Sequence, residues 1–257
     1  MKAPPRLYVS ADLAAGGAAA LAPGQAHYLG TVLRLGAGDE VALFNGRDGE
    51  WRGRIAALAR GGGSIAIEAR LRPQASGADL WLAFAPIKRA RLDFLVEKAT
   101  ELGASALLPV LTRRSVVDRI NRERLQAITI EAAEQSERLT LPALHELQPL
   151  DRLIAEWPQA RRLILCDESG TAPPIAAALA GAPPAPLAVL TGPEGGFAET
   201  ELDGLRKLPF VCPVGLGPRV LRADTAALAG LAVVQALAGD WRKEREAQGS
   251  APADVSP

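Results

Sequence analysis

The sequence predicts an α/β protein in which a small β-barrel precedes a mostly parallel sheet. From residue 80 to residue 238, short apolar runs alternate with stretches of helical periodicity. Strands that alternate with helices pack into a mainly parallel sheet covered on both faces. Before residue 73, short apolar runs follow one another closely between turn residues, which is typical of a small barrel.

The expected barrel fills the first seventy residues. Its turns are marked by Asn45-Gly46, Asp48-Gly49 and the glycine triplet 61–63, because these residues favour tight reversals. A short helix is expected at 26–34, and the Pro, Ser and Gly of 73–77 indicate a linker. The expected strands are 6–9, 40–44, 51–58 and 64–68.

The remainder alternates regularly. In the first expected helix, Leu92, Leu95 and Ala99 recur on one face and Gly103 follows as a stop signal. The expected strands are 80–84, 106–110, 163–166, 187–191 and 211–214, and the helices are 91–102, 121–137, 173–179, 199–208 and 223–238. We therefore expect a barrel domain at 1–75, an α/β domain at 76–243 and a disordered polar tail at 244–257.

Composition narrows the class of protein. The 257 residues have a formal net charge of zero, but residues 1–77 carry a net +3 and residues 85–125 a net +4. This asymmetry fits contact with a polyanion or an ordinary solvated surface. No apolar run is long enough to span a membrane, and the first residues lack the apolar core of a signal peptide. Cys166 and Cys212 have no metal-ligand spacing, so we expect buried free thiols in a cytoplasmic protein.

Two glycine-rich turns near the C-terminal end are the strongest functional signal. Gly192-Pro-Glu-Gly-Gly196 and Gly215-Leu-Gly-Pro-Arg219 each follow an apolar run. Ligands bind beyond the carboxyl ends of parallel strands, and glycine lets a ligand approach the backbone. Pro218 and Val220 do not fit a dinucleotide-binding G-x-G-x-x-G turn. A P-loop is absent, and two histidines in the whole chain argue against zinc or serine–histidine chemistry. The turns predict a different cofactor site.

Several ordered segments resemble the bacterial 16S ribosomal RNA uracil-N3 methyltransferases, a family of the SPOUT class. The resemblance covers residues 6–243. The segments are His27-Tyr-Leu-Gly-Thr-Val-Leu-Arg-Leu35, Gly38-Asp-Glu-Val41, Lys98-Ala-Thr-Glu-Leu-Gly103, Glu131-Ala-Ala-Glu-Gln-Ser-Glu-Arg138, Gly192-Pro-Glu-Gly-Gly-Phe197, Leu216-Gly-Pro-Arg-Val-Leu-Arg222, Thr225-Ala226 and Gly239-Asp240.

The resemblance implies a PUA-like RNA-binding barrel joined to a SPOUT domain with a C-terminal trefoil knot. It further implies a homodimer that uses S-adenosylmethionine, without a metal, to methylate N3 of a specific uridine in 16S rRNA of the small ribosomal subunit. The strand end 166–168 is expected to form a third wall of the cofactor site. The implied cofactor-binding residues are Thr191, Gly192, Gly195, Gly196, Leu216, Gly217, Val220 and Leu221.

The chemistry suggests further roles. Uridine N3 is a poor nucleophile until its proton leaves, so the site needs a base or a cation near O2 and O4. Arg222 and Arg138 are the candidate cations. Glu194 is a possible base or braces its loop, and Gln135 binds the base edge or caps its helix. Where the family usually has Glu, this chain has Asp224, either a helix N-cap, the interpretation we favour, or a participant in proton removal.

Basic side chains are candidate phosphate contacts, although each also fits a solvated surface. They are Arg6, Arg34, Arg52 and Arg54 in the barrel, and Lys88, Arg89, Arg91, Arg113 and Arg114 in the second domain.

Two other functions remain open. One is a SPOUT enzyme that methylates a different RNA position, such as a ribose oxygen; the segments at 98–103 and 131–138 argue against it. The other is a noncatalytic RNA-binding assembly factor, which predicts a damaged cofactor turn, and no damage is visible.

Overall fold

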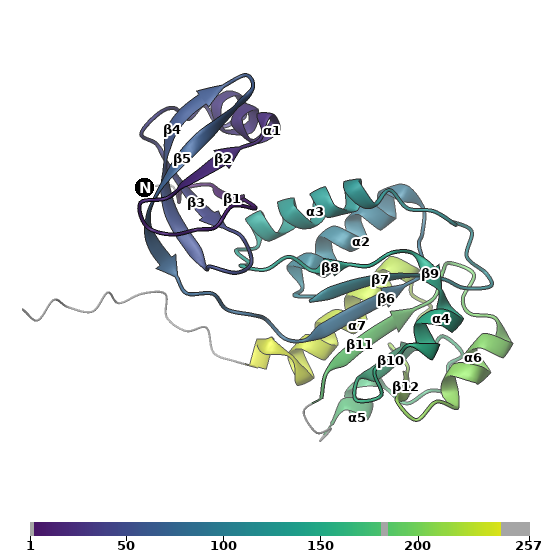
Figure 1. Cartoon of the computed structure of the whole chain (residues 1–257). Helices are drawn as coiled ribbons and strands as arrows, with labels where there is room; N and C mark the ends of the chain where they lie inside the picture. Colours follow the sequence, from purple (N-terminus) through teal and green to yellow (C-terminus); the bar gives the residue numbers. More distant parts are fainter. Residues whose placement is uncertain (1–2, 181–184, 243–257) are drawn as a thin grey trace, which may run out of the picture.

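Two β-sheets organise the molecule. The computed structural model describes residues 3–180 and 185–242 (Figure 1). One sheet is built from residues 6–72 and the other from strands that begin at residue 80. The predicted tail at 244–257 lies outside the described residues.

The first sheet has five strands in the order β1-β3-β4-β5-β2. Strand β1 runs parallel to β3, and the other pairs are antiparallel. No ladder joins the edge strands β1 and β2 within the described residues, so the sheet is an open path. Its apolar face includes Leu7, Leu43 and Ile65. The elements are β1 (Arg6–Tyr8), β2 (Ala18–Leu21), α1 (Pro23–His27), the π-helical turn η1 (Tyr28–Val32), β3 (Glu40–Phe44), β4 (Glu50–Ala59) and β5 (Gly62–Arg72).

The second sheet is parallel throughout, where a mostly parallel sheet was predicted. Its seven strands follow the order β12-β10-β11-β6-β7-β8, with β9 paired to β7. The strands are β6 (Leu80–Phe84), β7 (Ala106–Leu111), β8 (Ala143–Leu144), β9 (Gln148–Pro149), β10 (Arg162–Cys166), β11 (Leu187–Thr191) and β12 (Val211–Val214). The helices are α2 (Arg89–Glu101), α3 (Arg122–Gln135), α4 (Leu150–Ala155), α5 (Ile175–Leu179), α6 (Glu199–Arg206), α7 (Ala223–Ala238) and the short 3-10 turn η2 (Asp240–Arg242).

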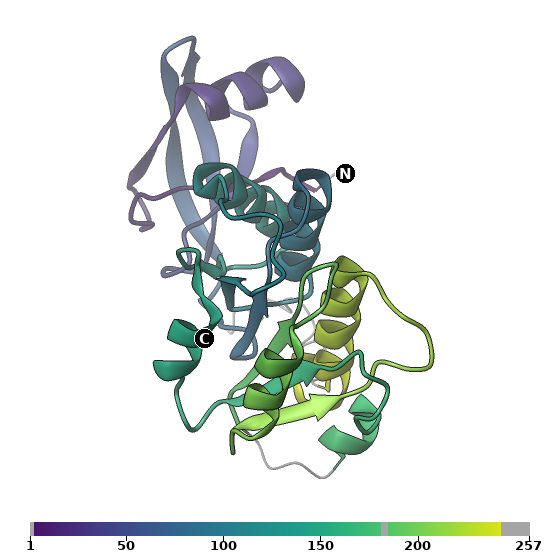
Figure 2. The same ribbon diagram turned by 90° about the vertical axis from the view of Figure 1, so that its right-hand side faces the viewer.

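Helices cover both faces of this sheet, as Figures 1 and 2 show. Successive side chains of a strand point to opposite faces. Accordingly Ile164 packs in the core under α2, α3, α5 and α7, whereas Leu165 packs in the core under α4 and α6. This two-sided burial explains why the strands are uninterrupted apolar runs.

Helix α7 brings the two glycine turns together. After β11 the chain continues to β12 on the far side of β10, and α7 then returns across β10, β11 and β6. A Cβ at Gly230 would lie 3.0 Å from Val189 Cγ1 and 3.3 Å from Cys166 Sγ. Glycine therefore lets α7 lie close to the strands, and the turn before α7 stays at their carboxyl edge.

Arg6 joins the first sheet to the second part of the chain. Its Nε donates to Glu50 Oε1 at 2.6 Å. Its other nitrogens donate to the carbonyls of Ala133, Glu134 and Arg138 at 2.6–3.0 Å. The last carbonyls of a helix lack intrahelical partners, so Arg6 caps the C-terminal end of α3. The predicted role of Arg6 as a phosphate contact is wrong, because its side chain is 10% exposed and engaged in these bonds.

A second junction lies at the end of α2. Gln235 of α7 donates to the carbonyl of Leu102 at 2.8 Å, and Asp240 accepts from the backbone N–H of Ala78 at 3.2 Å. Gly103 has a φ of +88°, and a Cβ there would lie 2.5 Å from Gln235 Nε2. The segments 98–103 and 239–240 thus meet at a junction that needs glycine.

We expect Arg6→Met to destabilise the protein by roughly 3 kcal/mol, because Glu50 loses a buried partner and three carbonyls lose their donor. Urea unfolding measures the change. The matched control is Arg47→Met, whose exposed ion pair with Asp12 at 2.7 Å is expected to contribute less than about 1 kcal/mol. Equal losses in both variants would contradict the junction.

We also expect Glu50→Gln to lower stability in a pH-dependent way. Burial opposes ionisation of Glu50, but bonds from Arg72 and Arg6 outweigh it and lower its pKa. A carboxyl with a lowered pKa stabilises the fold above its unfolded pKa and loses this effect as pH falls through its folded pKa. The difference in unfolding free energy between wild type and variant should therefore shrink on acidification; a constant difference would refute it.

Candidate functional site

A cavity of about 840 Å³ lies at the carboxyl edge of the second sheet. The exits of β10, β11 and β12 and the start of α2 and α7 surround it. Both glycine turns face it, as expected. All eight residues predicted to bind a cofactor line this cavity: Thr191, Gly192, Gly195, Gly196, Leu216, Gly217, Val220 and Leu221.

The first turn is shaped by its glycines and by a buried phenylalanine. Gly196 has a φ of +67°, and a Cβ there would lie 1.7 Å from Glu168 Oε1. A Cβ at Gly192 would lie 3.1 Å from the ring of Phe197, which is buried in the core under α4 and α6. A side chain at either glycine would displace the wall of the cavity.

The second turn is more open. Gly217 has a φ of +104°, and no atom lies within 4 Å of the position that its Cβ would take. The side chain of Val220 is 93% exposed, which is unusual for an apolar residue in a cavity wall. The backbone N–H of Gly215 donates a hydrogen bond to the carbonyl of Pro173 at 2.8 Å. The turn is therefore anchored at its base and offers apolar surface and backbone groups to a ligand.

The third wall is the expected strand end 166–168. Asp167 is 1% exposed and accepts from Arg206 of α6 at 2.6 and 2.9 Å. Burial opposes ionisation of Asp167, but bonds from Ser169 and Arg206 outweigh it and lower its pKa. Burial raises the pKa of Glu168 above its ordinary value and that of the Cys166 thiol to about 12. Cys166 therefore stays protonated, and Cys166 and Cys212 are both free.

The predicted catalytic residues divide into two groups. Arg222 and Glu194 line the cavity and are exposed. The carboxylate of Glu194 accepts no hydrogen bond from the described residues, so bracing of its loop is not seen.

Gln135 and Arg138 do not line the cavity. Gln135 is exposed at the last residue of α3. The guanidinium of Arg138 donates to the carbonyl of Thr100 near the end of α2, and burial lowers its pKa to about 10. Within one chain these two residues therefore belong to the junction region rather than to the cavity.

Asp224 is not a helix cap, contrary to the interpretation that the sequence favoured. The N-cap of α7 is Arg222, and Asp224 is the second helical residue. Asp224 Oδ1 is buried and has no hydrogen-bond donor within the described residues. Arg91 Nη1 lies 3.6 Å from it. Arg91 lines the cavity.

The remaining basic residues lie at two places. Lys88 and Arg89 at the start of α2 and Arg113 and Arg114 after β7 are exposed at the carboxyl edge of the second sheet. Arg114 also donates to the carbonyl of Gly195 at 3.0 Å, which ties it to the first turn.

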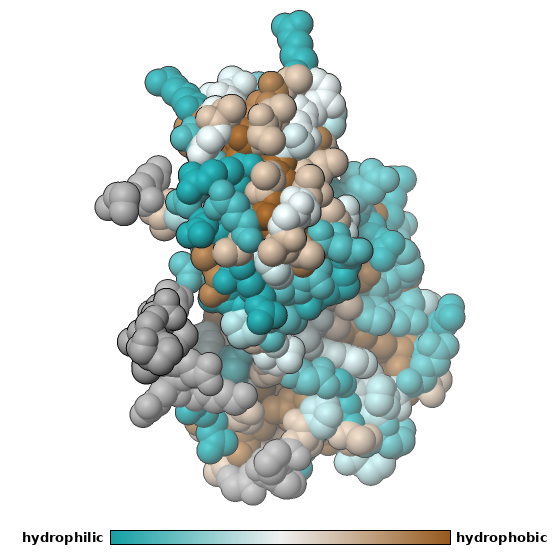
Figure 3. All heavy atoms as spheres, turned by 60° about the vertical axis from the view of Figure 1, so that its left-hand side comes forward, coloured by the Kyte–Doolittle hydropathy of each residue, from teal (hydrophilic) through white to brown (hydrophobic). Residues whose placement is uncertain are grey.

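On the first sheet, Arg52 and Arg54 form ion pairs with Glu68 at 3.0 and 2.8 Å. Arg34 is exposed and has a φ of +59°. Figure 3 shows an apolar band between hydrophilic side chains on one face of this part of the molecule. Arg52 and Arg54 are therefore paired with the carboxylates of Glu40 and Glu68.

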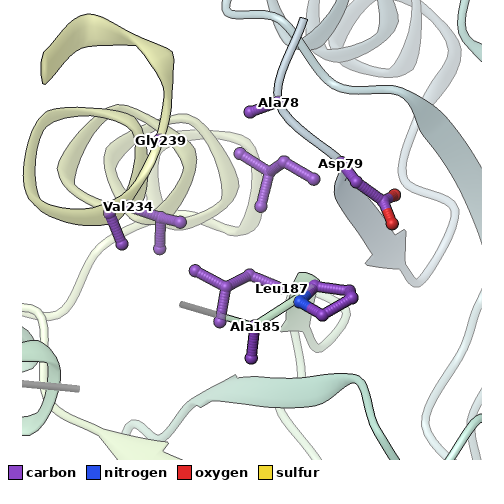
Figure 4. A pocket seen from close by; sticks show the side chains of 9 residues that line it. Ala78, Asp79, Ala185, Leu187, Val234 and Gly239 are labelled. Carbon is purple, nitrogen blue, oxygen red and sulfur yellow. The ribbon is translucent and has the colours of Figure 1, made fainter. Parts of the chain in front are cut away.

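A second cavity, of about 370 Å³, lies at the opposite edge of the sheet (Figure 4). It is lined by the amino ends of β6 and β11 and the end of α7, and it contains none of the predicted site residues. In the described ranges, no helix is long and apolar enough to cross a membrane. Over the same residues, no cluster of His, Cys, Asp or Glu is arranged to hold a metal ion.

Sequence reasoning missed three features of the site. The ion pair between Asp167 and Arg206 was not predicted, although an acidic residue directly after an apolar strand is a usable signal. Arg219 lines the cavity and was not singled out. Arg91 was expected on the RNA surface, but the start of α2 brings it to the cavity.

Comparison with known proteins identifies the family of this chain. Residues 74–235 match the RNA methyltransferase domain family and residues 21–68 match the RNA methyltransferase PUA domain. The chain is 33% identical over 238 residues to ribosomal RNA small subunit methyltransferase E of Rickettsia conorii, covering 90% of this chain and 95% of that protein. It is 34% identical over 236 residues to the Synechocystis protein of the same name, covering 90% and 77%.

Solved structures agree. The crystal structure of ribosomal RNA small subunit methyltransferase E from Neisseria gonorrhoeae, bound to S-adenosyl methionine, superposes with a TM-score of 0.82 at 27% identity, covering 93% of this chain and all of that one. A putative methyltransferase from Legionella pneumophila, in complex with the same cofactor, gives 0.81 at 30% identity, with 93% and 100% covered. With both turns in one cavity and these relatives matched over most of its length, the chain belongs to the ribosomal RNA small subunit methyltransferase E family.

Proposed function

We propose that the protein transfers a methyl group from S-adenosylmethionine to N3 of a specific uridine in 16S rRNA of the small ribosomal subunit. The observation that carries the proposal is the single cavity between the two glycine turns, in a chain of this family. The relatives' names support rRNA as the substrate, and the bound cofactor of two solved relatives supports the methyl donor.

The cavity fits that cofactor. Its volume of about 840 Å³ lies in the range of small-molecule sites. Open space next to Gly217 lets an adenosine approach the backbone, and the buried Thr191 and apolar Leu216 supply walls. The sulfonium group of the bound cofactor supplies an electrophilic methyl carbon. The protein's own contribution is to hold the target base in line with it, which is the main source of acceleration for a displacement.

Two exposed residues of the cavity are assigned chemical roles in this proposal. Arg222 precedes α7 and offers a cation to the uracil ring as it loses its N3 proton. Glu194, on the first turn, accepts that proton in this proposal. Arg138 and Gln135 are not retained, because they lie outside the cavity of this chain.

The finer architecture is also a proposal. We infer that the first sheet, although no ladder joins its edge strands, curves into a PUA-like barrel at 1–75, and that residues 76–243 form a SPOUT domain whose end is threaded as a trefoil knot. The passage of the chain from β11 across β10 to β12 and back through α7 supports the threading. We further infer a cytoplasmic homodimer and RNA contacts through Arg34, Lys88, Arg89, Arg113 and Arg114.

The test incubates the purified protein with labelled S-adenosylmethionine and small subunits that lack the modification, followed by mapping of the labelled nucleoside. Label at N3 of one uridine in 16S rRNA is expected. Label on a ribose would assign the chain to another RNA methyltransferase activity. No label on any RNA would favour the noncatalytic alternative.

We expect Gly196→Ala to weaken cofactor binding at least about tenfold, because an L side chain resists the positive φ and displaces Glu168. Calorimetric titration with the cofactor measures the change, and a thermal melt checks the fold. The matched control is Gly204→Ala in α6, where no atom lies within 4 Å of the added Cβ. Unchanged affinity in Gly196→Ala would exclude the first turn from the cofactor site.

We expect Arg222→Ala to reduce kcat about 100-fold, in line with loss of one charge-stabilising donor. Cofactor affinity should change only modestly, because the turn itself remains. Arg152→Ala is the control, since Arg152 of α4 forms an exposed ion pair with Glu156, which follows the helix. Loss of cofactor binding in Arg222→Ala would instead make Arg222 part of the cofactor site.

A further inference from the structure

The start of α2 carries an arginine that the site as proposed above does not use. Strand β6 pairs with β11, with Phe84 opposite Thr191. The backbone N–H of Ala85 then donates to the carbonyl of Thr191 at 3.2 Å. Helix α2 begins four residues later, at Arg89, so its first turn rises beside the cavity. Arg91 in that turn is part of the cavity wall.

Arg91 is held by one carboxylate. Its Nη1 lies 3.6 Å from Asp224 Oδ1 on the first turn of α7. The Asp224 side chain is 15% exposed, whereas that of Arg91 is 36% exposed. The buried partner is therefore the carboxylate, and the exposed partner is the cation. Asp224 also lies near the N-terminus of a sixteen-residue helix, where a negative charge is favoured.

Asp224 is not among the residues that line the cavity. Its Oδ1 atom is closed to solvent and faces Arg91. The guanidinium of Arg91, by contrast, donates no hydrogen bond to any described residue. Arg91 thus has donors available for a ligand in the cavity, with one carboxylate beside it at 3.6 Å.

The other cations of the cavity are not held in this way. Arg219 and Arg222 are exposed and form no ion pair with the described residues. A charge contributes most to catalysis when it is fixed before the reaction, because no reorganisation is then required. The remaining ionisable side chains that line the cavity are Cys166, Asp167, Glu168 and Glu194.

We propose that Arg91 is a catalytic cation for the target uracil and that Asp224 is its positioning residue; this rests on the proposed function. As N3–H ionises, the proton leaves to water, directly or through Glu194. The electron pair stays on the ring, spread over N3, O2 and O4. Arg91 stabilises that negative charge through a ring carbonyl oxygen. The N3 pair then forms the bond to the methyl carbon, and the carbon–sulfur pair goes to sulfur.

The test compares Arg91→Gln and wild type at saturating cofactor. We expect kcat to fall about 100-fold, with cofactor affinity, measured without RNA, changed less than about threefold. The difference in kcat between wild type and Arg91→Gln should shrink as pH rises. Without the cation beside it, the uracil loses its N3 proton only at higher pH. A purely structural role would give the same ratio at every pH.

The positioning role of Asp224 is tested separately, through the kcat of two variants at this residue. Asp224→Asn should lower kcat about tenfold, since Arg91 remains but is no longer held, and Asp224→Glu should restore most of the rate. The matched control is Arg124→Gln, which removes an ion pair between α3 and Asp93 of α2 at 2.7 Å, outside the cavity. This control should keep the wild-type rate, and thermal melts of all variants report folding.

Three results would overturn the inference. The first is an unchanged kcat in Arg91→Gln while wild type methylates uridine N3. The second is a loss of more than about tenfold in RNA-free cofactor affinity, which would place Arg91 on the cofactor. The third is a pH-independent loss matched by Arg124→Gln. If wild type itself methylates no uridine N3, the proposed function fails first and this inference falls with it.

Discussion

The close packing of α7 on the parallel sheet is the constraint on which the site depends. Gly230 permits the helix axis to approach Val189 and Cys166, because any side chain there would meet them at about contact distance or less. With α7 in place, the turn that precedes it lies at the carboxyl edge of the strands. The turn after β11 ends at the same edge. Two segments that are twenty residues apart thus become two walls of one cavity.

The same helix connects the cavity to the rest of the molecule. Its first turn carries Asp224 against Arg91 of α2, and its last turns carry Gln235 against the end of α2. Helix α2 is therefore fixed at both ends by α7. At the cavity, the buried carboxylate of Asp167 pairs with Arg206 of α6 at 2.6 Å, and the partly buried carboxylate of Asp224 lies 3.6 Å from Arg91 of α2. The exposed charged residues that line the cavity include Arg219, Arg222 and Glu194.

The junction between the two sheets explains residues that looked functional. Glu134 accepts from the backbone N–H of Tyr8 at 2.9 Å, and Arg6 caps the helix that contains Glu134. Burial in this contact raises the pKa of Glu134 above its ordinary value. The segment 131–138 contacts the first sheet through Ala133, Glu134 and Arg138. A distinctive motif can thus mark a junction as well as a reaction site.

Much of the fold was determined by local pattern. Apolar runs and helical periodicity predicted β11, β12 and α7 at their observed bounds, since burial on both faces leaves no other use for such runs. Strand β2 and helix α4 were missed, because Ala18–Leu21 has little β-branched character and Leu150–Ala155 is too short for a clear period. The two glycine turns could be recognised from the sequence. So many glycines directly after a strand indicate a positive φ or a close approach of another group to the backbone.

The identity of the charged partners was decided by tertiary structure alone. Arg6, Arg91 and Arg138 are equivalent in sequence, each a cation beside an apolar pattern. Arg6 caps the C-terminal end of α3, Arg91 lines the cavity, and Arg138 donates to the carbonyl of Thr100 near the end of α2. An ion pair depends on distance in space rather than along the chain. Arg6 and Glu50 are 44 positions apart in the sequence, and Arg91 and Asp224 are 133 positions apart. Periodicity along the chain carries no information about such contacts, so the sequence predicted the turns that face the cavity and the fold determined which charges line it.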